Sequence, residues 1–292
     1  MTDDFAAIFR AERPGWDPPF ALPEGVQVRR DVIFGTGGGR ELRADLFVPP
    51  ERGGDPRPAM LFIHGGGWRA GTRSQFYRQA ALLAAKGIVG VCCEYRLSGE
   101  GKYPAAVEDV KCAVRWMRAT AQELNLDPNR IGVAGGSAGG HLAAMVVTTP
   151  GIEELEGVGG HPDQRSDVQL GVLLNPVTDM VFFVASEPLH PAVAEFMGGT
   201  LDEMPQAYHQ ASPAEFVGPQ TPPCLLAHGT GDTTVPHEQS VRFADSMKQA
   251  GRQAELILVE GQPHGFFNSG PHFEVIHATM ERFILEHFGL RA

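Results

Sequence analysis

The pentapeptide Gly135-Gly136-Ser137-Ala138-Gly139 stands between an apolar run, residues 130–134, and a run of helical character, residues 141–147. This order predicts a strand, a tight turn and a helix, with Ser137 at the apex of the turn. Glycines on both sides of the serine are needed because the backbone bends sharply and the helix packs closely on the strand. The chain contains 36 glycines, so the pattern arises easily by chance and other motifs must decide its meaning.

The rest of the chain predicts an α/β protein with a mostly parallel central sheet and helices on both sides, because strand-length apolar runs alternate with helical ones. A hairpin formed by residues 26–34 and 41–48 comes first. Strands are expected at 59–63, 88–93, 131–134, 170–174, 223–227 and 255–259, and helices at 74–85, 105–121, 237–249 and 273–287.

We expect a single domain over residues 1–292, with an N-terminal arm at residues 1–25. Residues 176–222 interrupt the alternation and have poor periodicity. A long irregular segment inside a compact domain is usually functional, so this one is predicted to be a lid-like or substrate-binding insertion.

Composition argues against several classes of binding partner. The net charge is −11, from 24 basic and 35 acidic residues, which disfavours nucleic acids and anionic membranes. The sequence shows neither a signal peptide nor an apolar run long enough to span a bilayer, so we expect a cytoplasmic protein. The cysteines lack metal-ligand spacing and are predicted to be buried free thiols, with the neighbours Cys92 and Cys93 on opposite faces of a strand. A homodimer remains open.

A second motif, His64-Gly65-Gly66-Gly67-Trp68, directly follows the predicted strand 59–63. Consecutive glycines allow main-chain N–H groups to converge on one point with no side chain in the way. We therefore predict an oxyanion hole made by Gly65, Gly66 and Gly67 together with the N–H of Ala138. A plain flexible turn is the alternative. His64 is expected to shape the loop through hydrogen bonds rather than to catalyse.

Two further residues are placed for chemistry. Asp232 lies just beyond the strand 223–227, and His264 just beyond the strand 255–259. Ligands of open α/β sheets bind at the carboxyl ends of the strands, where Ser137 is also expected. Taken singly, Asp232 is an ordinary turn residue and His264 an ordinary loop histidine. Their order after Ser137 is the order of a Ser–Asp–His triad in this class of fold.

On these four stretches, residues 64–68, 135–139, 229–232 and 264–266, the chain resembles the α/β-hydrolase esterases, near the hormone-sensitive-lipase-like and bacterial feruloyl/acetyl-esterase groups. The resemblance implies hydrolysis of carboxylic esters without a cofactor or a metal. It implies that Ser137 is the nucleophile, His264 the base and Asp232 the residue that orients the imidazole. The short arm and modest insertion imply an open, shallow site for small acyl groups.

The acyl pocket is less well defined. Aromatic and methionine side chains of the loops are candidates for its walls, although such residues are as often simply packed. The candidates are Trp68, Phe182, Phe183, Phe196, Met197 and Phe266.

The predicted function is a serine carboxylesterase that hydrolyses short-chain or small aromatic acyl esters of a small-molecule substrate through an acyl-enzyme. We expect its activity to fall as the pH drops through about 6–7, where imidazoles take up a proton. An arylformamidase or other amidase is an alternative, because the same triad serves both reactions. A non-catalytic receptor on this fold would typically have lost a triad member, and this chain retains all three.

Overall fold

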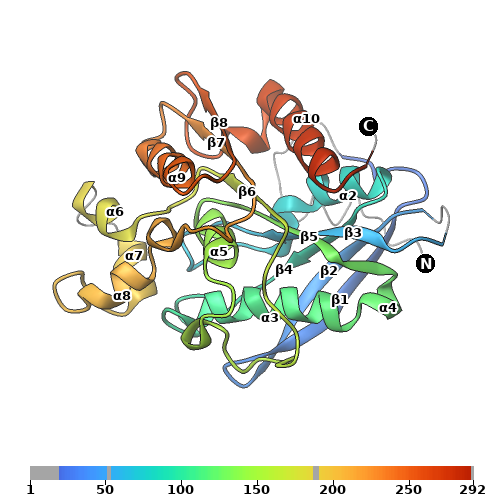
Figure 1. Ribbon diagram of the computed structural model, residues 1–292, viewed down its shortest axis with the longest axis horizontal. Coiled ribbons are helices and arrows are strands. Elements are labelled where there is room, and N and C mark those ends of the chain that lie inside the picture. The colour runs from blue at the N-terminus through green and yellow to red at the C-terminus, as the bar shows by residue number, and fades with distance from the viewer. Residues whose placement is uncertain (1–19, 51–53, 187–190, 291–292) are drawn as a thin grey trace.

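The computed structural model describes residues 20–50, 54–186 and 191–290, which fold around one central sheet (Figure 1). The predicted arm, residues 1–25, therefore lies largely outside the described residues. In the described part the sheet has eight strands in the order β1-β2-β4-β3-β5-β6-β7-β8. Their bounds are Gln27–Gly37, Arg40–Val48 and Arg57–Ile63 for β1 to β3, Val89–Cys93, Leu126–Gly136 and Leu170–Leu174 for β4 to β6, and Cys224–Gly229 and Ala254–Val259 for β7 and β8.

The sheet is mixed at one edge and parallel elsewhere. Strands β1 and β2 form the predicted antiparallel hairpin, and β2 is also antiparallel to β4. From β4 through β3, β5, β6, β7 and β8 every neighbouring pair is parallel. The inner parallel strands read as continuous apolar runs, as in β3, because both of their faces are buried, whereas the edge strand β8 is only partly buried. The carboxyl ends of β5, β7 and β8 consequently meet at one edge of the sheet.

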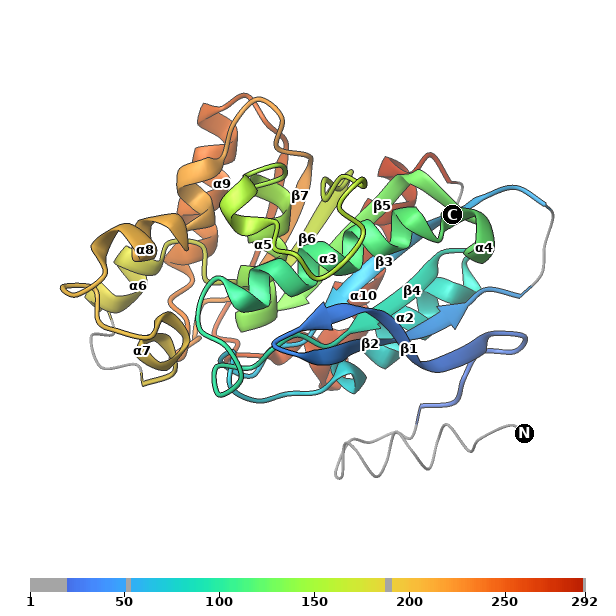
Figure 2. The same ribbon diagram turned by 90° about the horizontal axis from the view of Figure 1, so that it is seen from below.

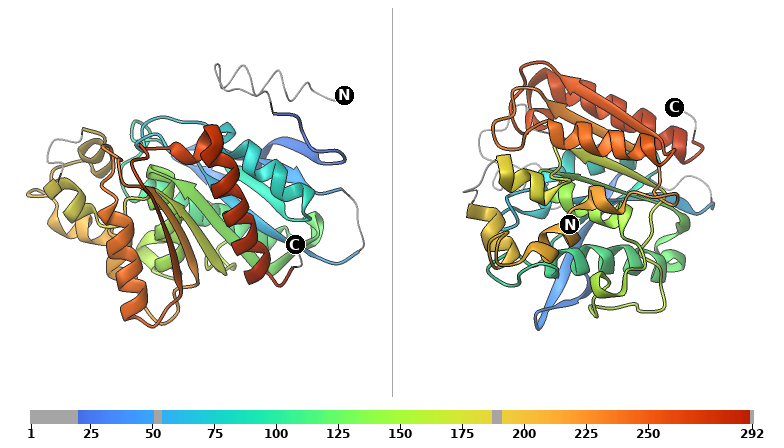
Figure 3. Two further views of the ribbon diagram at one scale, coloured as in Figure 1. Left: turned by 90° about the horizontal axis from the view of Figure 1, so that it is seen from above. Right: turned by 60° about the vertical axis from the view of Figure 1, so that its left-hand side comes forward.

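Helices cover both faces of this sheet. Apolar side chains of α3, α5 and α9 belong to one core cluster, and those of α2 and α10 belong to the other. Figure 3 shows α9 and α10 on opposite sides of the strands that they flank. The bounds of the helices are Tyr77–Ala85, Ala105–Ala119, Ala121–Leu124, Ala138–Thr148 and Met180–Ser186 for α2 to α6, and Pro191–Met197, Pro205–Gln210, Glu238–Gln249 and Gly270–His287 for α7 to α10.

Three predictions about local structure can be compared directly with this arrangement. Cys92 and Cys93 lie in different core clusters, so they do point to opposite faces of β4. All four cysteines are buried and unpaired, as expected. The helix predicted at 105–121 is instead divided at Thr120, where α3 ends and α4 begins.

The described part of the insertion 176–222 contains three short helices, α6, α7 and α8, and the 3-10 turn Pro213–Phe216. Figures 1 and 2 show the three helices grouped at one end of the molecule. Each has only six or seven residues. Two turns hold too few apolar repeats to be recognised by periodicity, which explains why the sequence predicts an irregular segment here.

Within the described ranges, every helix is too short or too polar to cross a bilayer.

Candidate active site

Ser137 lies in the turn between β5 and α5 with φ 57° and ψ −123°, a backbone conformation that residues other than glycine rarely adopt. The glycines of the pentapeptide are explained by contacts at this turn. A Cβ atom on Gly135 would lie 2.1 Å from the carbonyl oxygen of Gly139, and a Cβ atom on Gly139 would lie 2.1 Å from the oxygen of Ile63. The strand–turn–helix prediction is confirmed, and it leaves the Ser137 side chain partly exposed at the sheet edge.

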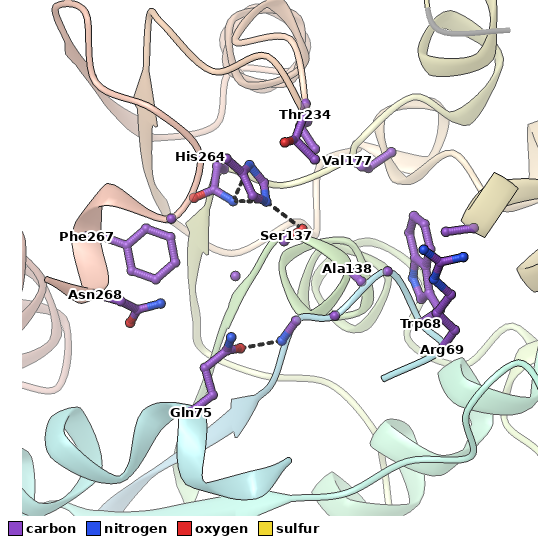
Figure 4. Close-up of a pocket in the computed structure, with 18 of the residues that line it drawn as sticks. Trp68, Arg69, Gln75, Ser137, Ala138, Val177, Thr234, His264, Phe267 and Asn268 are labelled. Atoms are coloured by element: carbon purple, nitrogen blue, oxygen red, sulfur yellow. Dashed lines mark hydrogen bonds between the residues drawn. The ribbon is translucent and has the colours of Figure 1, made fainter. Parts of the chain in front are cut away.

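The loops after β7 and β8 bring Asp232 and His264 to this serine. Figure 4 shows the bond between His264 and Ser137. The Nε2 atom of His264 lies 2.9 Å from Ser137 Oγ, and its Nδ1 atom lies 2.6 Å from Asp232 Oδ2. The imidazole can therefore accept the serine proton at one nitrogen while its other nitrogen donates to the carboxylate. The three side chains that the sequence singled out, separated by up to 127 residues, form one hydrogen-bonded chain.

The Asp232 carboxylate is enclosed by donors. Its Oδ1 atom accepts the N–H groups of Thr234 and Val235 at 2.8 and 2.9 Å. Its Oδ2 atom accepts from His264 and also lies 3.2 Å from Nε2 of His228. Burial raises the pKa of this carboxyl, but hydrogen bonds from the two histidines and the Val235 N–H outweigh burial, so the pKa lies well below its ordinary value. Asp232 is ionised throughout the neutral range.

Two residues near the triad were missed by the sequence analysis. His228 is the penultimate residue of the buried strand β7, four positions before Asp232, and that spacing was the available signal. Asn175 follows β6 with φ 36°. Its Nδ2 atom lies 3.3 and 3.4 Å from the two ring nitrogens of His264, so the amide lies against the imidazole. Its buried Oδ1 atom has no hydrogen-bond partner among the described residues.

The glycine loop, residues 64–68, lies beside Ser137, but one of its N–H groups already donates a hydrogen bond to a side chain. Gly66 and Gly67 have φ values of 122° and 60°, which favour glycine. The N–H of Gly65 donates to Oε1 of Gln75, as the dashed line in Figure 4 shows. Gly65 is therefore not an available oxyanion donor, contrary to the prediction.

The remaining candidate donors are the N–H groups of Gly66, Gly67 and Ala138, and all three residues line the cavity at Ser137. No described residue accepts a hydrogen bond from them. The N–H of Ala138 belongs to the first turn of α5, where backbone donors have no partner within the helix.

The cavity at the triad has a volume of about 350 Å³ and two chemically different sides. Figure 4 places Phe267, Asn268 and Gln75 on one side of Ser137, and Trp68, Arg69 and Val177 on the other. The side-chain amide oxygens of Gln75 and Asn268 already accept hydrogen bonds, Oε1 of Gln75 from the N–H of Gly65 and Oδ1 of Asn268 from Gln79. Their NH₂ groups are thus the polar feature of the first side.

Only some of the predicted pocket residues reach this cavity. Trp68 and Phe183 line it, together with Ala192 of α7. Phe182 instead lies under the guanidinium of Arg242, 4.6 Å from its ring centroid. The others, Phe196, Met197 and Phe266, are buried and are not among the lining residues.

Packing explains why Phe196 and Phe266 do not line the cavity. Phe196 stacks on Trp68 with a centroid separation of 4.7 Å, so it supports the wall from behind. Phe266 packs against His272 and Phe267, which leaves Phe267 as the phenylalanine of this turn that faces the cavity.

The remaining histidines of the motifs have structural contacts. His64 stacks on Tyr95 at 4.4 Å and its Nδ1 atom lies 2.9 Å from the oxygen of Gly65, consistent with a role in shaping the loop. His141 accepts from the Trp68 indole at Nδ1, and its Nε2 atom lies 2.9 Å from the carbonyl oxygen of Ala211. Burial lowers the pKa of His141 to about 4, so it is neutral at neutral pH. In the part of the chain that is described, no group of His, Cys, Asp or Glu side chains is arranged to hold a metal ion.

Comparison with known proteins agrees with this geometry. A family model described as BD-FAE matches residues 44–247, well over half of the chain. Esterase LipC of Mycobacterium tuberculosis is 30% identical over 245 residues, which make up 82% of this chain and 60% of LipC. Isoprenylcysteine alpha-carbonyl methylesterase ICME of Arabidopsis thaliana is 26% identical, over 82% of this chain and 56% of its own. The chain thus spans little more than half the length of these curated relatives.

Solved structures match over nearly their whole length. Thermogutta terrifontis esterase 2 with bound propionate is 32% identical with a TM-score of 0.78, and the match covers 94% of this chain and 98% of that one. A truncated carbohydrate esterase from gut microbiota is 27% identical with a TM-score of 0.80, covering 91% and 98% of the two chains. The chain belongs to the BD-FAE family, and its fold is that of the α/β-hydrolase esterases.

Proposed function

We propose that the protein is a serine carboxylesterase in which Ser137, His264 and Asp232 are the catalytic residues. The observation that carries the proposal is the hydrogen-bonded chain from Ser137 Oγ through the His264 imidazole to Asp232. Beside it lie backbone N–H groups from which no described residue accepts a hydrogen bond. The esterase names of the matching relatives and structures support the same reaction.

The mechanism follows from this arrangement. His264 Nε2 takes the proton of Ser137 as Oγ attacks the ester carbonyl, and the resulting oxyanion lies against the N–H groups of Gly66, Gly67 and Ala138. His264 then gives the proton to the departing alkoxide, which leaves as the alcohol. Water, deprotonated in turn by His264, attacks the acyl-enzyme and releases the acid. Asp232 stays ionised and stabilises the imidazolium in both halves.

The cavity supports short acyl groups. Its volume of about 350 Å³ is at the small end for ligand sites. On one side of the cavity, Trp68, Val177, Phe183 and Ala192 form an apolar wall with the exposed Arg69 beside it, and this wall suits a small alkyl or aromatic acyl group. The side with the NH₂ groups of Gln75 and Asn268 suits an alcohol part that carries oxygen acceptors. Structures of Thermogutta terrifontis esterase 2 contain propionate and butyrate, which supports the same acyl size by analogy.

A series of p-nitrophenyl esters with two to twelve acyl carbons tests this function. We expect kcat/KM to be highest at two to four carbons, and Ser137→Ala to abolish turnover while the protein stays folded. N-formylkynurenine, assayed in parallel, tests the amidase alternative. Faster turnover of the formamide than of p-nitrophenyl acetate would replace the esterase assignment. Failure of a fluorophosphonate to label Ser137 in the native protein would contradict serine catalysis altogether.

We also propose a cytoplasmic location and a small-molecule substrate, without a nucleic-acid or membrane partner. The net charge of −11 and the four buried, unpaired thiols support this assignment. A homodimer remains a prediction, which light scattering of the purified protein would test.

A further inference from the structure

His228, at the end of β7, has both ring nitrogens engaged although the mechanism above does not use it. The side chain is fully buried. Its Nδ1 atom lies 2.7 Å from Oγ of Ser240 on α9. Its Nε2 atom lies 3.0 Å from the carbonyl oxygen of Val235 and 3.2 Å from Oδ2 of Asp232. A second imidazole therefore contacts the same carboxylate oxygen as His264.

The neighbours of His228 determine which nitrogen carries its proton. A carbonyl oxygen and an ionised carboxylate can only accept hydrogen bonds, so Nε2, which faces both, must be the donor. The hydroxyl of Ser240 can donate, so Nδ1 needs no proton of its own. A neutral His228 thus accepts from Ser240 at Nδ1, and its Nε2–H is shared between the Val235 carbonyl at 3.0 Å and Asp232 Oδ2 at 3.2 Å.

These contacts determine how the negative charge of Asp232 is shared among its hydrogen-bond donors. Oδ1 is held by the N–H groups of Thr234 and Val235, which fixes the plane of the carboxylate. Oδ2 is shared between His228 and His264. Each donor stabilises part of the negative charge, so a donor from His228 weakens the attraction between Asp232 and a protonated His264.

We propose that His228 is a positioning residue of the triad: it holds Asp232 Oδ2 toward His264 and, by sharing that oxygen, sets the pH at which the acid limb of the activity profile lies. The inference rests on the proposed esterase function. Of the charged groups on the elements packed around β7, His237 lies 3.6 Å from Glu238, Arg242 pairs with Asp179 at 2.8 Å, and Glu255 of β8 pairs with Arg282. Asp245 and Lys248 are exposed on α9.

A matched pair of substitutions isolates the contact. In His228→Gln the side-chain amide reaches the position of Nε2 and can still donate to Asp232. In His228→Asn the shorter amide reaches only the position of Nδ1, so it keeps a partner in Ser240 and loses the carboxylate. Both variants bury one amide, so they differ mainly in this hydrogen bond. His228→Met, of similar size without any donor, provides a second test should the Asn variant fail to fold.

The measurement is kcat/KM for p-nitrophenyl acetate from pH 5 to pH 9, with the melting temperature recorded for each variant. In the Asn and Met variants we expect the acid limb to move to higher pH by about half a unit to one unit, because Asp232 then directs more of its charge to His264. In the Gln variant the limb stays at the native pH. KM changes little in all of them, because His228 does not line the cavity.

An acid limb that stays in place in the Asn and Met variants, while only stability falls, would overturn the inference and leave His228 a packing residue. A shift to lower pH would overturn it as well. Either outcome leaves the esterase assignment intact, because that assignment depends on turnover by the native protein and its loss in Ser137→Ala.

Discussion

Replacement of Asp232 by asparagine is the perturbation whose effect the geometry defines most fully. Oδ1 accepts two backbone N–H groups, from Thr234 and Val235, so an oxygen must remain at that position. The amide NH₂ is therefore forced into the place of Oδ2, 2.6 Å from Nδ1 of His264. To accept from this NH₂, Nδ1 must lose its proton, and the neutral imidazole then carries its proton on Nε2.

That tautomer cannot take the proton of Ser137. We expect kcat at pH 7.5 to fall by about 10⁴-fold, the loss typical of this change in serine triads, which corresponds to about 5.5 kcal/mol in activation free energy. Asp232→Ala should be less damaging than Asp232→Asn, because a cavity or a water in place of the carboxylate does not impose the wrong tautomer. The control is Asp179→Asn, which breaks an ion pair with Arg242 outside the triad and should leave kcat within about threefold.

Steady-state hydrolysis of p-nitrophenyl acetate measures these rates, with Ser137→Ala as the background. If Asp232→Asn retained more than about a tenth of the native kcat, or exceeded Asp232→Ala, the orientation assigned to the carboxylate would be wrong.

Two further substitutions test other parts of the structure. Gln75→Leu removes the acceptor of the Gly65 N–H, which costs about 1–3 kcal/mol, so we expect the glycine loop to shift and kcat to fall by about fivefold or more; an unchanged kcat would show that the glycine loop needs no such anchor. Burial lowers the pKa of His277 from 6.5 to about 4, so the native state resists the proton that the unfolded chain binds, and stability falls as the pH drops from 6.5 to 4 by up to about 3 kcal/mol. His277→Leu removes this contribution. Urea unfolding at pH 7 and 4.5 should show a smaller acid loss in the variant, and equal losses would contradict the assignment.

Local patterns were sufficient to predict the fold and the triad. The glycines around Ser137 are required by contacts within one strand–turn–helix unit, so their spacing is visible in the sequence. Parallel strands bring their carboxyl ends to one edge, so Asp232 and His264 could be placed beside Ser137 without knowledge of their distances.

The neighbours of the triad depended on packing between distant segments. Gln75 takes the N–H of Gly65 because the 3-10 turn Arg73–Phe76 lies beside the glycine loop, and no periodic pattern records that approach. His228 reaches Asp232 because the chain turns back on itself after β7.

The sequence by itself therefore determined the alternation of strands and helices, the turn at Ser137 and the placement of Asp232 and His264 at the same sheet edge, because each follows from backbone geometry along a short stretch. The tertiary structure alone decided that Phe267 rather than Phe266 faces the cavity and that Gly65 is not a free donor. Those outcomes depend on the direction of single side chains and N–H groups, which contacts from elsewhere in the chain impose.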